Sequence, residues 1–287
     1  MKVFPCAKIN LGLYVTERRP DGYHNLQTVF YPIPLCDELE VAFAESKSPL
    51  SASCIGGFPV LCDTLEMEGI HLEGPVDDNL VMRAVRLLRD EGHAIPPLRI
   101  RLCKHIPSGA GLGGGSSDAA YMLCLVNTLC QLGLSDDELE RLAARLGADC
   151  AFFVRHRPVY ATGIGDQFSP ISLDLRGWWL LLIKPDDFIS TREAYANVHP
   201  RLPRHLLTES ILHPLTEWPT LIGNDFEESV FPQHPTVAHI KQQLYAAGAH
   251  YAAMSGSGSS VFGLFSECPA ETLLHSFAPH FVFKAQL

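Results

Sequence analysis

The sequence predicts an α+β fold in two domains. Apolar patterns typical of strands are interleaved with helix-like stretches in both halves of the chain. They do not follow the strict alternation of one strand with one helix that is typical of a doubly wound parallel sheet. A chain of 287 residues, 47% of them hydrophobic, can fill one large domain or two mid-sized ones. We place the boundary after residue 155, so the predicted domains are 1–155 and 156–287.

The chain is predicted to begin with strands. Residues 3–15 alternate loosely between apolar and polar side chains, as a half-buried strand does. A turn should follow at 20–24, because Pro and then Asp-Gly interrupt regular structure. Extended segments then cover 29–41, and we expect Pro32 and Pro34 to break them.

Helices are predicted to enter after a loop-rich stretch. Residues 44–76 are rich in Ser, Gly and Pro, which predicts loops and short strands. A helix should begin after Asn79 and close at Gly92. Apolar residues alternate with arginines over 98–102, which predicts a half-buried strand. The glycine-rich segment after it leads into a helix over about 116–132.

The remaining elements are predicted from the same signals. Ser135 and Glu138 have the spacing of a capping box and predict a helix that ends near Gly147. In the second half we predict strands at 178–183, 251–254, 261–265 and 281–285, a connection or short helices within 201–222, and helices at 237–248 and 269–277.

Charge and hydropathy exclude some classes of function. The net charge of −10 makes the chain a poor general binder of nucleic acid, since phosphate contacts need a basic surface. No apolar run reaches the roughly 18–20 residues of a membrane helix. Lys8 also interrupts what could be the core of a signal peptide. We therefore expect a soluble, cytoplasmic protein that binds neither nucleic acid nor a membrane.

The nine cysteines show no pattern of a metal site. Their number is odd and there is no Cys-x-x-Cys pair. Most of them lie within apolar runs. We therefore expect buried thiols in a reducing compartment.

The segment 107–117 is the most informative part of the sequence. Five of its eleven residues are glycine, which leaves backbone N–H groups uncovered by side chains. The helix that starts at about Ser116 would direct its positive end into this loop. The segment therefore predicts an anion site suited to a di- or triphosphate. A second Gly/Ser stretch, 254–260, suggests a second wall of the same site.

Two known phosphate motifs fit this loop poorly. A P-loop needs lysine after its second glycine, but Gly115 follows Gly114. A dinucleotide fingerprint matches formally at Gly109, Gly111 and Gly114, but the acids about 20 residues further on belong to a helix start at Asp136. A flexible turn that needs left-handed backbone angles stays open as an alternative.

Charged and polar side chains near these motifs allow two interpretations each. Lys8 either reaches solvent from an edge strand or is a partly desolvated ammonium near a carboxylate or phosphate. Asn10, two residues later, faces the same side. Asp149 either caps the next helix or serves as a functional carboxylate. Tyr23 and His24 are either ordinary turn residues or bind a nucleobase, by stacking and by hydrogen bonding.

Together these motifs resemble the GHMP kinase superfamily. Three superfamily motifs occur in order, at 7–11, 107–117 and 255–258. The motif Arg-Pro-Asp-Gly-Tyr-His at 19–24 is similar to that of the branch that acts on 4-diphosphocytidyl-2-C-methyl-D-erythritol. The resemblance spans the whole chain. It departs from the common pattern at Cys150 and Ala151, where similar proteins have Val-Pro.

The resemblance implies a fold and an activity. The fold would be a ribosomal-protein-S5-like N-terminal domain and a ferredoxin-like C-terminal domain with the site between them. The activity would be transfer of a phosphoryl group from ATP to the 2-hydroxyl of that small-molecule substrate, in the non-mevalonate route to isoprenoid precursors. Mg²⁺ would accompany ATP, and Ser117 is a candidate ligand by its position.

The resemblance also implies roles for single residues. Asp149 would be the general base and Lys8 its charged partner, and His24 would read the edge of the cytosine. The implied substrate-binding residues are Asn10, Tyr23, His24 and, as a second stacking aromatic, Tyr195. The implied ATP-binding residues are Pro107, Ser108, Gly109, Ala110, Gly111, Leu112, Gly113, Gly114, Gly115, Ser116 and Ser117, and the third motif loop contains Ser255, Gly256, Ser257 and Gly258.

Two other functions stay open at this point. The first is another kinase of the superfamily that acts on a small alcohol such as mevalonate or homoserine, against which Tyr23 and His24 argue. The second is a nucleotide-binding protein without catalysis on the same scaffold, against which Lys8 and Asp149 argue.

Overall fold

The chain forms two compact units whose segments are interleaved in sequence. The structure, a computed structural model, describes residues 1–44, 53–55, 58–60, 62–71 and 74–287. Unit 1 contains Met1–Ala7, Leu35–Ser108 and Gly113–His156, and unit 2 contains Lys8–Pro34, Gly109–Leu112 and Arg157–Leu287. These units are not the two domains predicted from the sequence. The predicted domain boundary after residue 155 stays a prediction.

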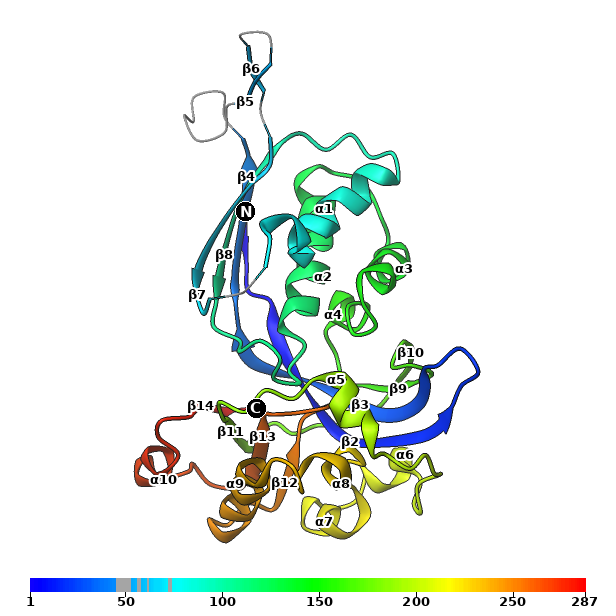
Figure 1. Cartoon of the computed structure of the whole chain (residues 1–287), viewed down its shortest axis with the longest axis vertical. Helices are drawn as coiled ribbons and strands as arrows, with labels where there is room; N and C mark the ends of the chain where they lie inside the picture. The colour runs from blue at the N-terminus through cyan, green and yellow to red at the C-terminus, as the bar shows by residue number, and fades with distance from the viewer. Residues whose placement is uncertain (45–52, 56–57, 61, 72–73) are drawn as a thin grey trace. The chain divides into compact units, whose positions relative to one another are not determined.

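Unit 1 is a mixed sheet covered by helices on one face, as Figure 1 shows. Its sheet has the order β1 (Lys2–Val3), β4 (Glu38–Phe43), β8 (Leu98–Lys104) and β7 (Thr64–Gly69). Strand β8 pairs antiparallel with β4 and parallel with β7. The helical elements are η1 (Val76–Asp78), α1 (Leu80–Asp90), α2 (Gly114–Leu129), α3 (Asp136–Leu146) and α4 (Phe152–Arg155), and β5 (Ser53–Ile55) pairs with β6 (Phe58–Val60).

Local signals account for several elements of unit 1. In β8, buried and more exposed residues alternate, so its apolar residues enter the core and its arginines do not. The Asn79 side chain caps α1 by accepting a hydrogen bond from the Val81 N–H. Ser135 and Glu138 form the predicted capping box of α3. These predictions are confirmed.

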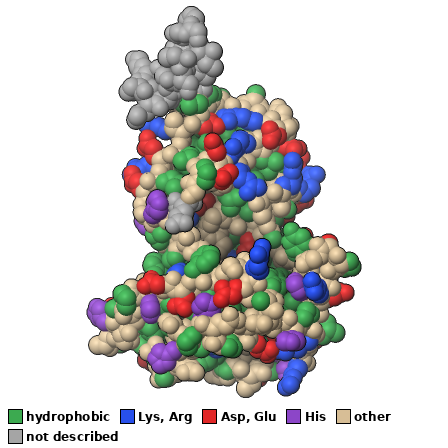
Figure 2. Space-filling model, viewed as in Figure 1, with side chains coloured by type: hydrophobic (Ala, Val, Ile, Leu, Met, Phe, Trp, Pro, Cys, Tyr) green, Lys and Arg blue, Asp and Glu red, His purple; other side chains and the backbone are tan. Residues whose placement is uncertain are grey.

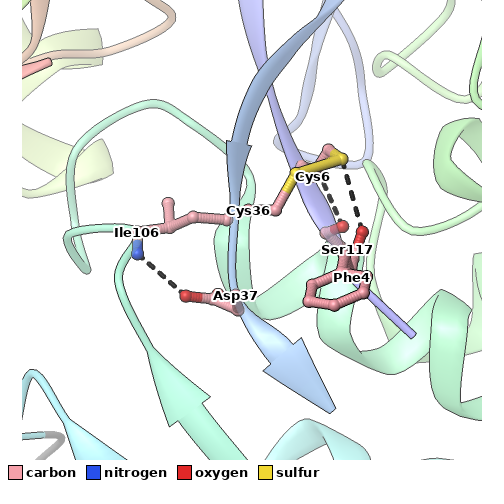
Figure 3. Close-up of a disulfide and its surroundings, with 6 residues drawn as sticks. All are labelled: Phe4, Cys6, Cys36, Asp37, Ile106 and Ser117. Atoms are coloured by element: carbon pink, nitrogen blue, oxygen red, sulfur yellow. Dashed lines mark hydrogen bonds between the residues drawn. A yellow bond between two sulfur atoms is a disulfide. The ribbon is translucent and has the colours of Figure 1, made fainter. Parts of the chain in front are cut away.

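The cysteines differ from the prediction. Cys6 and Cys36 form a disulfide in unit 1, as Figure 3 shows, so these two are not thiols. Among the other described cysteines Cys150 is buried, whereas Cys62 and Cys268 are exposed. The prediction of buried thiols was wrong for most of them, because apolar neighbours in sequence do not fix which face a residue takes. The cytoplasmic location stays a prediction.

Unit 2 contains two antiparallel sheets. One has the order β10 (Gln167–Pro170), β9 (Val159–Thr162), β3 (His24–Cys36) and β2 (Cys6–Arg18). The other has the order β12 (Tyr251–Met254), β13 (Val261–Phe265), β11 (Trp179–Lys184) and β14 (Phe281–Gln286). The helical elements are α5 (Thr191–Ala196), α6 (Leu207–Ser210), η2 (Leu215–Glu217), α7 (Trp218–Leu221), α8 (Phe226–Val230), α9 (Pro235–Ala246) and α10 (Glu271–Ser276).

The core of unit 2 joins segments that are far apart in sequence. One buried cluster contains Leu13 from β2, Leu181 from β11, Phe226 from α8, Ile240 from α9 and Val261 from β13. Unit 1 and unit 2 together give the α+β fold that the sequence predicts. None of the helices among the described residues has the length and apolar character to span a membrane. Figure 2 shows acidic and basic side chains interspersed on the viewed surface.

The extent of two predicted elements needs correction, and two short helices were not predicted. Strand β3 continues through Pro32 and Pro34 instead of breaking there. Its pairing with β9 ends at Phe30, so the missing N–H groups of the prolines cost no bond in that ladder. Helix α2 begins at Gly114, not at Ser116, and ends at Leu129. The short helices α5 and α8 were not predicted, because they lack a sustained apolar period.

Candidate active site

The glycine-rich loop connects β8 to α2. Gly113 is the N-cap of α2 and has a left-handed backbone with φ of +70°. The first N–H groups of a helix have no partner within the helix, and the helix dipole adds partial positive charge there. Helix α2 contains 16 residues and begins where the glycine-rich loop ends. Phosphate binding at this end stays a prediction.

The two Gly/Ser loops contact each other within unit 2. The Ser255 hydroxyl donates a hydrogen bond to the Gly111 carbonyl at 2.9 Å, and the Ser260 N–H donates to the Ala110 carbonyl at 3.3 Å. The approach is so close that a Cβ on Gly111 would lie 2.0 Å from the Ser255 carbonyl oxygen. Glycine is therefore required at this position by space as well as by its φ of +73°.

Lys8 is buried and bound to the glycine-rich loop. Its side chain is 3% exposed, and its ammonium donates to Asn10 Oδ1 at 2.7 Å and to the Gly111 carbonyl at 3.1 Å. The ammonium also lies 4.9 Å from the centre of the Phe30 ring. The alternative in which Lys8 reaches solvent from an edge strand is therefore wrong.

Asn10 connects the first motif to the third. Its Nδ2 donates to Thr28 Oγ1 at 2.9 Å, and its backbone N–H donates to Ser255 Oγ at 3.3 Å. Lys8 and Asn10 thus bond to each other and together contact the glycine-rich loop, at Gly111, and the third motif loop, at Ser255. Asn10 is 3% exposed, so its amide is fixed in one orientation.

Asp149 lies in the turn between α3 and α4, in unit 1. The N-cap residue of α4 is Ala151, so Asp149 is not itself the N-cap residue of this helix. The role of Asp149 as a functional carboxylate stays a prediction. The turn lies beside the start of α2, because a Cβ on Gly147 would lie 3.2 Å from Cys150 Sγ and 4.0 Å from Ser116 Oγ. Burial raises the pKa of the Cys150 thiol to about 11, so it stays protonated.

One predicted pair spans the two units. Lys8 belongs to unit 2 and Asp149 to unit 1. Their pairing stays a prediction. Within each unit, however, each residue adjoins a part of the glycine-rich loop, Lys8 at Gly111 and the Asp149 turn at Ser116.

The predicted substrate turn is held by local polar contacts and has exposed aromatic surface. Arg19 and Asp21 form an ion pair across it, and the Tyr23 N–H donates to Asp21 Oδ1 at 3.0 Å. The Tyr23 side chain is 61% exposed. Its phenol ring is thus accessible to a ligand, as the predicted role in base stacking requires.

His24 and Tyr195 come together although 171 positions separate them in sequence (195 − 24). Their ring centres are 4.7 Å apart at an interplanar angle of 22°, which is a stacked pair. Phe226 contacts Tyr195 edge-on at 4.7 Å. Burial, with a smaller effect of Arg18, lowers the pKa of His24. Near neutral pH its imidazole therefore offers one donor and one acceptor.

Ser117, the candidate Mg²⁺ ligand, lies in α2, and its role toward Mg²⁺ stays a prediction. Its side chain is fully buried and its hydroxyl donates to the Cys6 carbonyl at 2.8 Å, as Figure 3 shows. No group of three or more acidic, His or Cys side chains suited to a metal occurs among the described residues. Mg²⁺ in nucleotide sites is often held largely by phosphates and water.

Several residues around the loops were missed by the sequence analysis. Asn224 donates from Nδ2 to the carbonyls of Met254 and Gly256, each at 2.8 Å, and so supports the third motif loop. Asp37, Lys104 and Asp118 form a buried cluster beside the glycine-rich loop. Lys104 and Asp118 flank the loop directly, which is a signal that could have found them, whereas Asn224 has none.

Comparison with known proteins places these motifs in a family. The model of the GHMP kinases N terminal domain matches residues 79–157, and that of the GHMP kinases C terminal domain matches 208–281. A 4-diphosphocytidyl-2-C-methyl-D-erythritol kinase of Bacteroides thetaiotaomicron is 55% identical over 266 residues, 92% of each chain. One of Bacteroides fragilis (strain YCH46) is 52% identical and matches over 100% of both chains.

Solved structures agree with this assignment. A crystal structure of 4-(cytidine 5'-diphospho)-2C-methyl-D-erythritol kinase has a TM-score of 0.78 at 32% identity and full coverage of both chains. The mevalonate kinase of Methanococcus jannaschii has a TM-score of 0.71 at 14% identity, which shows the shared fold alone. The chain therefore belongs to the GHMP kinase family, in the branch of the 4-diphosphocytidyl-2-C-methyl-D-erythritol kinases.

Proposed function

We propose that the protein transfers the γ-phosphoryl group of ATP to the 2-hydroxyl of 4-diphosphocytidyl-2-C-methyl-D-erythritol, in the non-mevalonate route to isoprenoid precursors. The observation that carries the proposal is the position of the Asp149 turn in unit 1. It adjoins Ser116 in the first turn of α2, where the glycine-rich loop ends. A carboxylate that can accept a proton thus lies next to a helix end that can bind phosphate.

The proposed chemistry is an in-line phosphoryl transfer. The substrate oxygen forms a bond to the γ-phosphorus, the bond from this phosphorus to the ADP oxygen breaks, and Asp149 accepts the hydroxyl proton. The transition state is loose and its charge is spread over the transferred group, so positioning and electrostatics dominate. The N–H groups of the loop and of the first turn of α2 supply fixed dipoles for this charge.

Lys8 has a different part in the proposal. Its ammonium is buried and held by Asn10 and the Gly111 carbonyl, which fixes a positive charge at the loop backbone. In this position we propose that it is the charged partner of the base and neutralises charge that develops on the transferred group. When bound with ATP, Mg²⁺ would add to this neutralisation.

Substrate choice is assigned to the turn at 19–24 and its neighbours. A neutral His24 can donate and accept hydrogen bonds, as the edge of a cytosine requires. Tyr23 offers an exposed ring for stacking. Tyr195 supports His24 by stacking on it, which ties α5 to the substrate turn.

A coupled assay of ADP release with the cytidyl substrate tests the proposal. Asp149→Asn should leave ATP binding roughly intact and slow turnover about 10²-fold or more, because the base is lost. A near-normal turnover number in this variant would contradict the role of Asp149. Turnover of mevalonate or homoserine, but not of the cytidyl alcohol, would show another small-alcohol kinase.

A second experiment separates substrate binding from nucleotide binding. His24→Ala should raise KM for the cytidyl substrate much more than KM for ATP, since only the cytosine contact is removed. The matched control is His205→Ala, an exposed histidine of the same unit. Equal changes in both KM values would refute cytosine recognition by His24.

A further inference from the structure

Three charged side chains are buried together in unit 1, next to the glycine-rich loop. Asp37, Lys104 and Asp118 are each at most 3% exposed. The Lys104 ammonium donates to Asp37 Oδ2 and, at 2.6 Å, to Asp118 Oδ2. Lys104 ends strand β8, Asp37 precedes β4 and Asp118 lies in α2. One ammonium thus connects two strands of the sheet with a helix.

Asp37 holds the start of the loop. Its Oδ1 accepts the backbone N–H of His105 at 2.6 Å and that of Ile106 at 2.8 Å, the second of which Figure 3 shows. These two residues lead directly into Pro107, the first residue of the loop. Because backbone groups are held, the direction in which the chain leaves β8 is set by this carboxylate and not by the side chains of His105 and Ile106.

Lys104 and Asp118 hold the end of the loop. The Lys104 ammonium lies 3.5 Å from the position that a Cβ on Gly114 would take, directly beside the first residue of α2. Asp118 is one turn further along the same helix and accepts from this ammonium. The start of α2 is thereby tied to the end of β8 by a single cation.

The charges in this cluster need a reason beyond stability. A buried ion pair contributes little compared with apolar residues of the same volume, because its desolvation offsets the attraction. Here two carboxylates share one ammonium, and burial raises the pKa of Asp118 to about 7. Asp118 Oδ1 is also buried without a hydrogen-bond partner among the described residues. Such an arrangement sets geometry at a cost in stability.

We propose that Asp37, Lys104 and Asp118 are positioning residues that fix both ends of the glycine-rich loop and thereby set the affinity of the protein for nucleotide phosphates. They act through the loop backbone and do not touch the nucleotide. The inference rests on the proposed function only in taking ATP as the nucleotide.

Asp37→Asn is the main test, and Asp63→Asn is its matched control. Asp63 lies at the other end of β8, where it accepts the Leu98 N–H at 2.8 Å and pairs with Arg89 at 2.9 Å. Both aspartates therefore accept backbone N–H groups at one end of β8, Asp63 at its first residue and Asp37 just beyond its last, and both bind a cation in the same unit. Only Asp37 does so at the glycine-rich loop.

Binding of a non-hydrolysable ATP analogue is measured by calorimetry, and KM for ATP and for the cytidyl substrate by ADP release. Asp37→Asn should weaken analogue binding and raise KM for ATP about tenfold, the usual effect of one lost hydrogen bond to a charged group. KM for the cytidyl substrate should change less than about twofold. Asp63→Asn should lower the melting temperature but leave analogue binding unchanged.

Equal effects of Asp37→Asn and Asp63→Asn on analogue binding would overturn the proposal, as would equal changes in both KM values for Asp37→Asn. If Asp37→Asn does not fold, Asp118→Leu takes its place, since it keeps the branched shape of the side chain and leaves Lys104 and Asp37 as a neutral pair. Unchanged analogue binding in this folded variant would also overturn the proposal. Because calorimetry needs no acceptor, a wrong substrate assignment would appear separately, as wild-type binding without turnover.

Discussion

Replacing Gly111 by alanine should displace the glycine-rich loop. The new Cβ would lie 2.0 Å from the Ser255 carbonyl oxygen, whereas such contacts are essentially never shorter than 3.0 Å. The two loops must therefore separate by at least 1.0 Å (3.0 − 2.0). The left-handed backbone of Gly111 adds about 1–2 kcal/mol for any residue with a Cβ.

This displacement would move the Gly111 carbonyl, which accepts two hydrogen bonds. The Gly111 carbonyl accepts from Lys8 at 3.1 Å and from Ser255 at 2.9 Å, so a shift of 1 Å disrupts both contacts. Misplacement of about 1 Å near reacting groups costs on the order of 10²-fold in rate. We therefore expect kcat/KM for ATP to fall about 10²-fold in Gly111→Ala.

Gly133→Ala is the matched control. Gly133 has a φ of +72°, almost the same as Gly111, but a Cβ there meets nothing within 4 Å. Both variants should lose melting temperature from backbone strain, and only Gly111→Ala should also lose kcat/KM. The coupled assay and thermal unfolding are measured on both. Equal kcat/KM values in the two variants would refute the steric argument.

Two further predictions concern stability. Reduction of the Cys6–Cys36 disulfide, which spans a sequence separation of 30, should lower the free energy of unfolding by about 3–4 kcal/mol through the entropy of the unfolded chain. Urea unfolding with and without reductant measures this, and a reductant effect that persists in Cys36→Ser would contradict it. Hydrogen bonds from His234 to Glu193 and then to Asp187 raise its pKa, so its stabilisation is complete below the unfolded pKa of about 6.5 and is lost as pH rises through the folded pKa. Urea unfolding across this pH range should show a loss of at most about 1 kcal/mol that His234→Gln lacks, and the same pH dependence in both proteins would count against it.

Elements with local signals could be predicted from the sequence. The Asn79 cap of α1, the capping box at Ser135 and the alternation in β8 each depend on residues within one turn or one strand. The course of β3 through Pro32 was mispredicted because it depends on where the ladder with β9 ends. Strand pairing is a long-range property that local composition does not contain.

Some residues of the candidate site could likewise be predicted from local sequence, whereas others could not. The glycine-rich loop and Lys8 could be located from the sequence, because glycine clusters and a charge in an apolar run are local features. The resemblance implies Tyr195 as a stacking aromatic, but its contact with His24 is known only from the structure. The cluster at Lys104 and the support from Asn224 required the structure, since their partners are distant in sequence. The disulfide was missed for the same reason.

The interleaving of the units has a consequence for folding during synthesis. Strand β2 leaves the ribosome long before some of its partners in unit 2, such as Ser255, which bonds Asn10 across a separation of 245 residues. At about 5–20 residues per second, these partners appear roughly 12–50 s later (245 divided by 20 and by 5). During this interval the apolar strand that contains Lys8 has no finished unit 2 to enter. A chaperone that shields nascent β2 would therefore act on the same strand that the folded protein uses at its glycine-rich loop.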